Sequence, residues 1–446
     1  MPTKPSKTVH NINGKTTKTI KVAVLEAELL FWATCAKRFF SVILDDYQWT
    51  KNNMTYNITT HLLSDKDILN GKLSASNFDV LVIPGGGVGD GHSIMKGFNS
   101  SVKVRRWKKN IRNFVEMGGG CVGFCGGASL ITPLSMGKNR KPTTFVERQY
   151  NKSSLGISCI ISYYKYLAFP LFYMFQWNHP EKIGTTAYVF SFEPGMTKDG
   201  KRIHSGGVPI DFKVNKDSPI FSDYLDDRIR MRWWGGPALI VPKNPDRELS
   251  ILAKYPEVEL YENKSTRIHA WKYVGGVRGL IIAFFKALRF IKDNKLNLLE
   301  FSMLTYHFAG DWKLTDKIIE SDLANRPAIT AEIFPNENKG RVILCTAHPE
   351  YMIWQEGQIK EKNDNKFNCL ASGLYQWQNI AKLSEPIDDN LTHTWWVVRR
   401  LIAWAAKIPD ECLPPIEKQK VSEKDMLILS KNIFWDGTLL NQIENI

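Results

Sequence analysis

A glycine-flanked cysteine, Cys125, constrains the fold of this chain more than any other feature. It lies in the run Gly-Gly-Gly-Cys-Val-Gly-Phe-Cys-Gly-Gly-Ala-Ser at residues 118–129. Glycines on both sides of a residue allow a sharp turn from a buried strand into a helix, with one side chain held at the apex. A thiol at a helix N-terminus has its thiolate stabilised by the helix dipole. The pattern therefore predicts a nucleophile at Cys125; a small, buried cysteine in a tight junction is the structural alternative.

The segments before this run predict an α/β fold with a parallel, doubly wound sheet. Residues 21–25 and 78–83 are short, continuously apolar runs, as in strands that are buried on both faces. Residues 102–116 place apolar side chains on one helical face and basic side chains on the other, which is typical of a helix that covers a sheet. Strand, helix, strand, turn and helix follow one another as in βαβ units.

The rest of the chain predicts further strands and helices. Strands are expected at 248–255, 328–332 and 340–346. The basic, apolar stretch 267–297 predicts an inserted helix packed on the core, with contact to a membrane surface or a partner as the alternative. The aromatic stretch 155–175 predicts a packed segment, because a lysine and a proline interrupt it; a membrane-spanning helix is its alternative.

Composition argues against several functional classes. The chain has seven cysteines but no Cys-x-x-Cys pair, so neither a disulfide framework nor a zinc knuckle is predicted. The P-loop pattern and His-Glu-x-x-His are absent, and we predict no metal and no cofactor. The net charge of +14 comes from lysines dispersed along the chain, so we do not expect specific nucleic-acid binding. Without a secretion signal at the N-terminus, the expected location is the cytoplasm.

A base and an orienting acid follow the last predicted strand. His348 and Glu350 are separated by a single proline, which keeps the residue before it in extended backbone. In an extended chain, residues two apart point to the same side, so Glu350 could accept the imidazole N–H of His348. A nucleophilic cysteine needs such a base and a group that orients it. We therefore predict that Cys125, His348 and Glu350 act together.

Glycines near the cysteine predict donors for a negatively charged oxygen. The backbone N–H of Gly126 is the expected first donor of an oxyanion hole. Gly86 and Gly87, in the loop after the strand at 78–83, are the expected second donors. A phosphate-binding turn is the alternative for this loop.

A tryptophan-rich turn at residues 230–241 runs into a short apolar strand. Trp233, Trp234 and Gly236 could wall a pocket beside the site, and a structural turn is the alternative.

Three motifs resemble those of the class I glutamine amidotransferase superfamily, in the same chain order: residues 84–87, 123–127 and 348–350. In more detail, the chain resembles the domain at the N-terminus of eukaryotic biotin-protein ligases. This resemblance implies a flavodoxin-like three-layer α/β/α sandwich. It also implies a Cys125–His348–Glu350 triad that forms a thioester with an amide substrate.

The resemblance divides the chain into regions. Residues 21–360 are expected to form the amidotransferase-like α/β domain, with insertions at about 155–228 and 256–324. Residues 1–20 are expected to be a flexible basic tail, and residues 361–446 a mainly helical C-terminal extension.

Two positions depart from the pattern of the superfamily. Glutaminases usually carry a glutamine four residues after the cysteine, where this chain has Ser129. The related peptidase branch has a histidine where this chain has Gly126. We therefore expect a cysteine-dependent amide hydrolase or amidotransferase-like protein whose small-molecule or peptide substrate need not be glutamine. A catalytically idle binding or regulatory module is the first alternative, and a scaffold that contacts a membrane or a partner through its aromatic insertions is the second.

Overall fold

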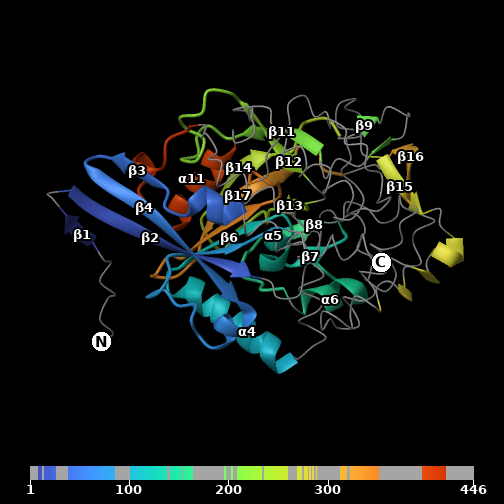
Figure 1. Cartoon of the computed structure of the whole chain (residues 1–446), viewed down its shortest axis with the longest axis horizontal. Coiled ribbons are helices and arrows are strands. Elements are labelled where there is room, and N and C mark those ends of the chain that lie inside the picture. Colours follow the sequence, from blue (N-terminus) through green and yellow to red (C-terminus); the bar gives the residue numbers. More distant parts are fainter. Residues whose placement is uncertain are drawn as a thin grey trace.

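The described residues build a mixed central sheet of eleven strands, shown in Figure 1. The structure is a computed structural model. It describes residues 9–12, 15–26, 39–85, 101–137, 141–152, 154–163, 195–196, 202–203, 208–233, 236–259, 269–273, 276–279, 281–282, 284–285, 288, 312–318, 322–350 and 394–417.

Five parallel strands form the centre of this sheet. They are β2 (Lys15–Glu26), β4 (Met54–Ser64), β5 (Val80–Ile83), β6 (Gly120–Phe124) and β18 (Arg341–Cys345). Their spatial order is β4, β2, β5, β6 and β18, or 2-1-3-4-5 in chain order. The protein is therefore an α/β protein whose sheet is compatible with a flavodoxin-like fold. In such sheets, ligands bind outside the carboxyl ends of the parallel strands.

Antiparallel strands extend the sheet on both sides. Beside β4 and β2 lie β3 (Gln48–Lys51) and β1 (Val9–Ile12). Beyond β18 follow β17 (Pro327–Ile333), β14 (Leu249–Lys254), β11 (Val208–Val214) and β12 (Arg228–Trp233). The antiparallel strands β17 and β14 confirm the strands predicted at 328–332 and 248–255, and β18 confirms that at 340–346.

Smaller elements lie outside this sheet. One group consists of β7 (Leu134–Ser135), β8 (Ile161–Tyr163) and β13 (Ala238–Ile240). Two separate antiparallel pairs join β9 (Gly195–Met196) with β10 (Arg202–Ile203), and β15 (His269–Tyr273) with β16 (Trp312–Ile318). Helix α6 spans Phe145–Asn151, and the 3₁₀ turn η4 spans Asp410–Cys412.

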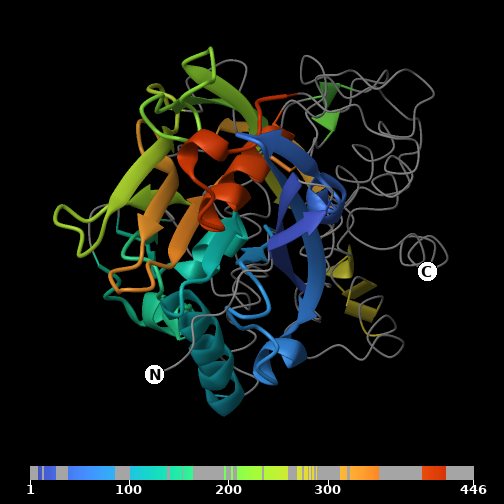
Figure 2. The same cartoon turned by 90° about the vertical axis from the view of Figure 1, so that its left-hand side faces the viewer.

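Helices cover both faces of the parallel strands, and each face has its own core. Neighbouring residues of β2 alternate between the two cores: Val22 and Val24 lie in one, and Ala23 and Leu25 in the other. Helix α4 (Ser101–Glu116) packs on the second face together with α2 (Asp65–Leu69) and α5 (Gly126–Ile131). Helix α11 (Trp395–Ala405) contacts β6 and β18 on the first face, as Figure 2 shows in red.

The helix predicted over 102–116 is confirmed by α4. Its predicted apolar face is buried, with these members: Val104, Trp107, Ile111, Phe114 and Val115. Helix α11 is buried on all sides rather than on one face, because it lies between the sheet and the segment that includes Ile43 and Tyr47. The predicted boundary after residue 360 lies outside the described residues.

The flexible tail predicted over residues 1–20 is wrong for the part that the structure describes. Strand β1 pairs with β2, and residues 16–26 of β2 pair along the whole of β4. Threonine and isoleucine favour strands, and Ile20 is fully buried beneath the polar residues around it. The lysines of this segment make its sequence resemble a polar tail, although it forms a strand.

The inserted helix predicted over 267–297 is also wrong at its start, where β15 is a strand that pairs antiparallel with β16. The described residues between 276 and 288 are helical, but none is buried in the core. None of the helices in the described ranges combines the length and apolar composition that a bilayer crossing requires. Of the aromatic stretch 155–175, the structure describes 155–163, which include β8.

Candidate active site

A sharp turn at Cys125 joins β6 to α5. The residue has φ 47° and ψ −113°, a conformation that an ordinary side chain rarely adopts. The backbone N–H of Cys125 donates to the carbonyl oxygen of Cys345 at 2.7 Å, which fixes the turn to the end of β18. Such strain persists only where its surroundings impose it, and it is common at functional sites.

Gly127 allows this turn to press against the end of β5. A Cβ atom on Gly127 would lie 2.1 Å from the carbonyl oxygen of Ile83, well inside any real contact. The second glycine after the cysteine is therefore needed for close backbone approach, as the sequence pattern predicts. The carboxyl ends of β5, β6 and β18 meet here.

His348 and Glu350 contact each other directly. The Nδ1 atom of His348 lies 2.7 Å from Oε1 of Glu350, and both side chains are buried. Beside a carboxylate, Nδ1 carries the proton, which leaves Nε2 able to accept one. The backbone N–H of His348 donates to the carbonyl oxygen of Arg232 at 2.8 Å, so β12 holds this turn from the other side.

Gly85 brings the cysteine and the histidine together. A Cβ atom built on Gly85 would lie 2.6 Å from Cε1 of His348 and 2.9 Å from Cβ of Cys125. Both side chains therefore lie against the same glycine at the end of β5. The side chains of Cys125 and His348 also form a hydrogen bond. All three predicted chemical groups thus meet in one buried cluster.

Electrostatics in this cluster favour a protonated imidazole. Burial by itself lowers the pKa of His348, but attraction to Cys125 and Glu350 and the hydrogen bonds to both outweigh it and raise the pKa to about 10. An imidazole with a raised pKa holds a proton taken from a neighbouring thiol more firmly than a free imidazole does. The arrangement therefore suits His348 as a base beside Cys125.

The start of α11 holds the His348–Glu350 turn. The hydroxyl of Thr394 donates to the carbonyl oxygen of Pro349 at 2.7 Å, and the indole N–H of Trp395 donates to that of Glu350 at 3.1 Å. The sequence did not predict this contact. No local pattern links residues 45 positions apart.

The remaining predicted residues are placed in part. Gly126 is the buried first residue of α5, while Gly86, Gly87 and Trp234 lie outside the described residues. Trp233 is buried, and its indole N–H donates to the carbonyl oxygen of Gly236 at 3.1 Å.

Gly236 lies directly against the backbone of Thr346, since a Cβ on this glycine would be 1.9 Å from the oxygen of Thr346. The tryptophan-rich turn therefore supports the segment that leads from β18 to His348. In the described part of the chain, no three or more His, Cys, Asp or Glu side chains are grouped to hold a metal ion.

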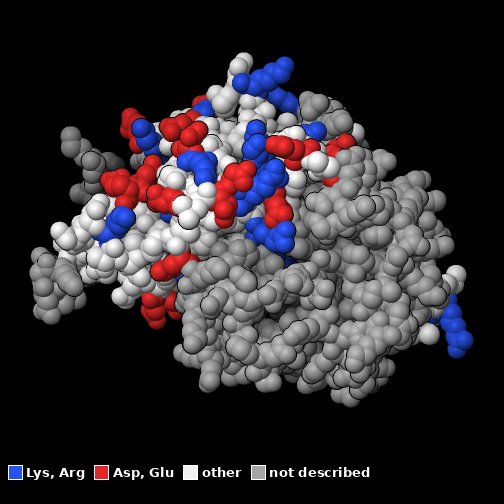
Figure 3. Space-filling view, turned by 90° about the horizontal axis from the view of Figure 1, so that it is seen from above, with Lys and Arg blue, Asp and Glu red and all other residues white. Residues whose placement is uncertain are grey.

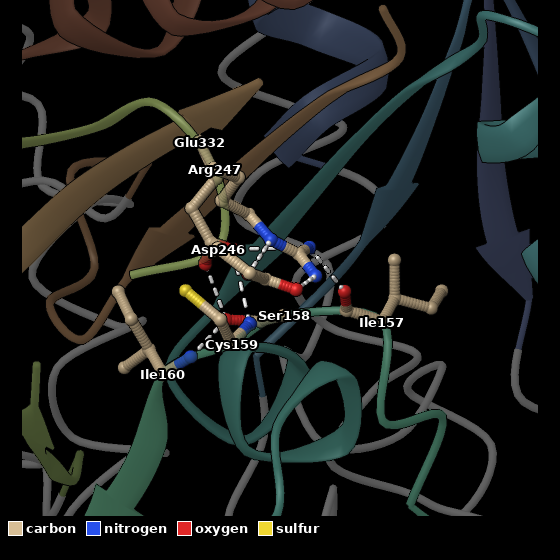
Figure 4. A network of polar contacts seen from close by, with 7 residues as sticks. All are labelled: Ile157, Ser158, Cys159, Ile160, Asp246, Arg247 and Glu332. Atoms are coloured by element: carbon tan, nitrogen blue, oxygen red, sulfur yellow. Dashed lines mark hydrogen bonds and ion pairs between the residues drawn. The ribbon is translucent and has the colours of Figure 1, made fainter. Parts of the chain in front are cut away.

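A second buried carboxylate, Glu332 of β17, lies in a different polar cluster (Figure 4). It accepts hydrogen bonds from the hydroxyl of Ser158, the backbone N–H of Cys159 at 3.0 Å and the guanidinium of Arg247 at 3.4 Å. Arg247 also donates to the carbonyl oxygen of Ile157 at 2.8 Å. This cluster joins the segment before β8 to the sheet.

Comparisons with known proteins leave the family open. No protein-family model and no curated protein matches the chain. Among solved structures it is similar to a ThuA-like protein from Bacteroides uniformis, with 10% sequence identity and a TM-score of 0.28, over 74% of this chain and 81% of that chain. A TM-score this low carries no argument about fold or function. Both therefore rest on the residues of this chain.

Proposed function

We propose that the protein is a cysteine-dependent amide hydrolase or amidotransferase-like enzyme. One observation carries the proposal: the side chains of Cys125 and His348 lie together against Gly85 at the sheet edge. Nδ1 of His348 is hydrogen-bonded to Oε1 of Glu350 at 2.7 Å, and Cys125 occupies a strained turn. This arrangement supplies a nucleophile, a base and an acid that orients the base.

In the proposed reaction, His348 takes the thiol proton of Cys125, and the sulfur attacks the carbonyl carbon of an amide. The carbonyl oxygen becomes an oxyanion, for which the backbone N–H groups of Gly126 and of Gly86 or Gly87 are the proposed donors. The imidazolium then gives its proton to the nitrogen, and the C–N bond breaks to leave a thioester and free ammonia or amine. Water, deprotonated by His348, hydrolyses the thioester and restores the thiol.

The motifs and the strand order support a flavodoxin-like, class I glutamine amidotransferase-like sandwich of the biotin-protein ligase N-terminal type. The position that usually holds a glutamine carries Ser129, which is buried and whose N–H donates to the Cys125 carbonyl at 3.2 Å. We therefore propose a small-molecule or peptide amide as substrate, and glutamine is only one of the amides to be tested.

The burial of Cys125 favours a second function. Only 2% of this residue is exposed, so a substrate reaches the sulfur only if neighbouring chain moves. A binding or regulatory module that keeps the turn without turnover fits the same burial.

Release of ammonia or amine from a panel of amides, glutamine included, separates the two functions. The enzyme is expected to lose this release in the Cys125→Ser variant and to keep it in the Cys159→Ser control. Removing a catalytic nucleophile lowers kcat on the order of 10⁶-fold. Release that survives in Cys125→Ser would contradict the mechanism, and no release from any amide by wild-type protein would favour the binding module.

A further inference from the structure

An exposed apolar stripe lies on the helical residues between 276 and 288. Phe285 is 63% exposed and Val277 72%, although both residue types are usually buried. Four exposed apolar positions follow one another at spacings of three or four residues: Val277, Ile281, Phe284 and Leu288. Phe285 lies four residues after Ile281, so all five share one side of the helical turns. Ile282, beside this stripe, is also exposed.

The residues of the stripe belong to neither hydrophobic core. The rings of Phe284 and Phe285 contact each other edge to face, with centroids 5.8 Å apart. These helical turns, yellow in Figures 1 and 2, lie at the periphery of the molecule, away from the parallel strands. The prediction that this helix packs on the core is therefore wrong for its described residues. A contiguous exposed apolar surface marks a site that contacts a membrane or another protein.

The charges near the stripe in the sequence favour an anionic lipid surface. Residues 263–292 contain seven lysines and arginines and no aspartate or glutamate. Among them, Arg278 is exposed and directly follows the first residue of the stripe. A helix that combines an apolar face with basic residues binds in the interface of a bilayer, and each basic residue near the surface adds attraction to anionic headgroups.

We propose that the described helical residues between 276 and 288 form a peripheral membrane anchor for bilayers that contain anionic lipids. The stripe inserts between the headgroups, parallel to the membrane plane, while Arg278 contacts their negatively charged groups. This helix is separate from the Cys125 cluster, and the proposal does not depend on the chemistry of that cluster.

Vesicle flotation of the full chain tests the anchor. Wild-type protein is expected to float with phosphatidylcholine vesicles that contain phosphatidylserine, and to float less with phosphatidylcholine alone. Phe285→Glu is expected to lower the partition coefficient roughly tenfold or more, because it removes apolar area and adds a repelled charge. Arg278→Ala is expected to lower it roughly fivefold.

Phe145→Glu is the matched control, since Phe145 is 66% exposed and Phe285 is 63% exposed. This variant is expected to float like wild-type protein. The proposal is overturned if wild-type protein stays at the bottom at low salt, or if Phe285→Glu floats as well as Phe145→Glu. It is also overturned if light scattering shows a wild-type dimer that Phe285→Glu dissociates while neither protein floats, because the stripe then binds a second copy.

Discussion

Two buried glutamates, Glu332 and Glu350, differ in the hydrogen-bond partners that surround them. Glu332 accepts hydrogen bonds at both oxygens, from the Ser158 hydroxyl at one and from the Cys159 N–H and Arg247 at the other. Glu350 is bonded through Oε1 to His348, and among the described residues its Oε2 has no partner. Several donors hold the Glu332 carboxylate in place, whereas the Glu350 carboxylate contacts one titratable group, the imidazole of His348.

The cysteines of the two clusters differ in the same way. Burial and the neighbouring Glu332 raise the pKa of Cys159 to about 12, so it remains a thiol at neutral pH. Cys125 instead has a histidine beside it and a strained backbone beneath it. A buried cysteine near a glutamate is therefore not a reactive site by itself. The histidine between the two groups makes the difference.

The largest expected effect comes from removing that histidine. His348→Ala should lower amide hydrolysis about 10⁴-fold, because it removes the base and leaves Glu350 with no group to orient. Alkylation of Cys125 by iodoacetamide, followed by mass spectrometry, should slow about 10²-fold.

Cys159 is the internal control in the alkylation experiment, and its slow labelling should be the same in both proteins. If Cys125 labels no faster than Cys159 in wild-type protein, the two clusters do not differ in reactivity and the nucleophile proposal fails.

A milder substitution should displace Cys125 and His348 from each other without removing either side chain. Gly85→Ala places a Cβ atom 2.6 Å from Cε1 of His348 and 2.9 Å from Cβ of Cys125, so one of the two side chains must move. A displacement of about 1 Å in a catalytic pair can cost on the order of 10²-fold in rate. The measurement is kcat for amide release, together with the Cys125 alkylation rate.

Gly71→Ala controls for the loss of a glycine, because a Cβ built there meets no atom within 4 Å apart from its chain neighbours. The φ of 79° at this position strains an alanine. The substitution should lower stability but leave kcat unchanged. Equal loss of kcat in both variants would mean that the effect of Gly85→Ala comes from destabilisation.

The parts of the site that local sequence patterns predict are those made by neighbouring residues. His348 and Glu350 are two residues apart, and the glycines around Cys125 are adjacent to it, so spacing alone indicates their geometry. The parallel strand order then brings the two motifs together. The contact between Trp395 and Glu350 follows from tertiary packing, and no periodic pattern in the sequence predicts it.

The Glu332 cluster was not predicted for the same reason. Its members come from three segments, at 157–160, at 246–247 and in β17, and each member has an unremarkable sequence context. Strand β2 was predicted too short because lysines and threonines dominate its first half, and pairing with β4 outweighs that polarity.

Removing a charge from the Glu332 cluster should reduce stability rather than activity. Arg247→Met leaves the Glu332 carboxylate buried without its guanidinium, which should cost about 2 kcal/mol in the free energy of unfolding. Urea denaturation measures this loss. The control is Arg230→Met, which breaks the ion pair with Asp211, where both side chains are largely exposed and the expected cost is about 0.5 kcal/mol. If Arg247→Met instead lowered kcat and left stability unchanged, the Glu332 cluster would have a role in amide hydrolysis.

The smallest expected effect is a pH dependence of the free energy of unfolding that comes from Glu332 alone. Burial raises the pKa of this carboxyl above its usual 4.5, although the hydrogen bonds from Ser158 and Cys159 and the charge of Arg247 oppose the rise. The folded state therefore holds the proton more tightly than the unfolded state. Stability due to this group is greatest below pH 4.5 and falls as the pH rises through the folded pKa.

Glu332→Gln has no titrating group at this position, so the stability of wild-type protein relative to the variant should decrease between pH 4 and pH 7. Urea denaturation of both proteins across this range measures the difference. A constant difference would mean that Arg247 and the other donors offset the burial of the carboxylate completely, and Glu332 would then be ionised in the folded protein as readily as in the unfolded chain.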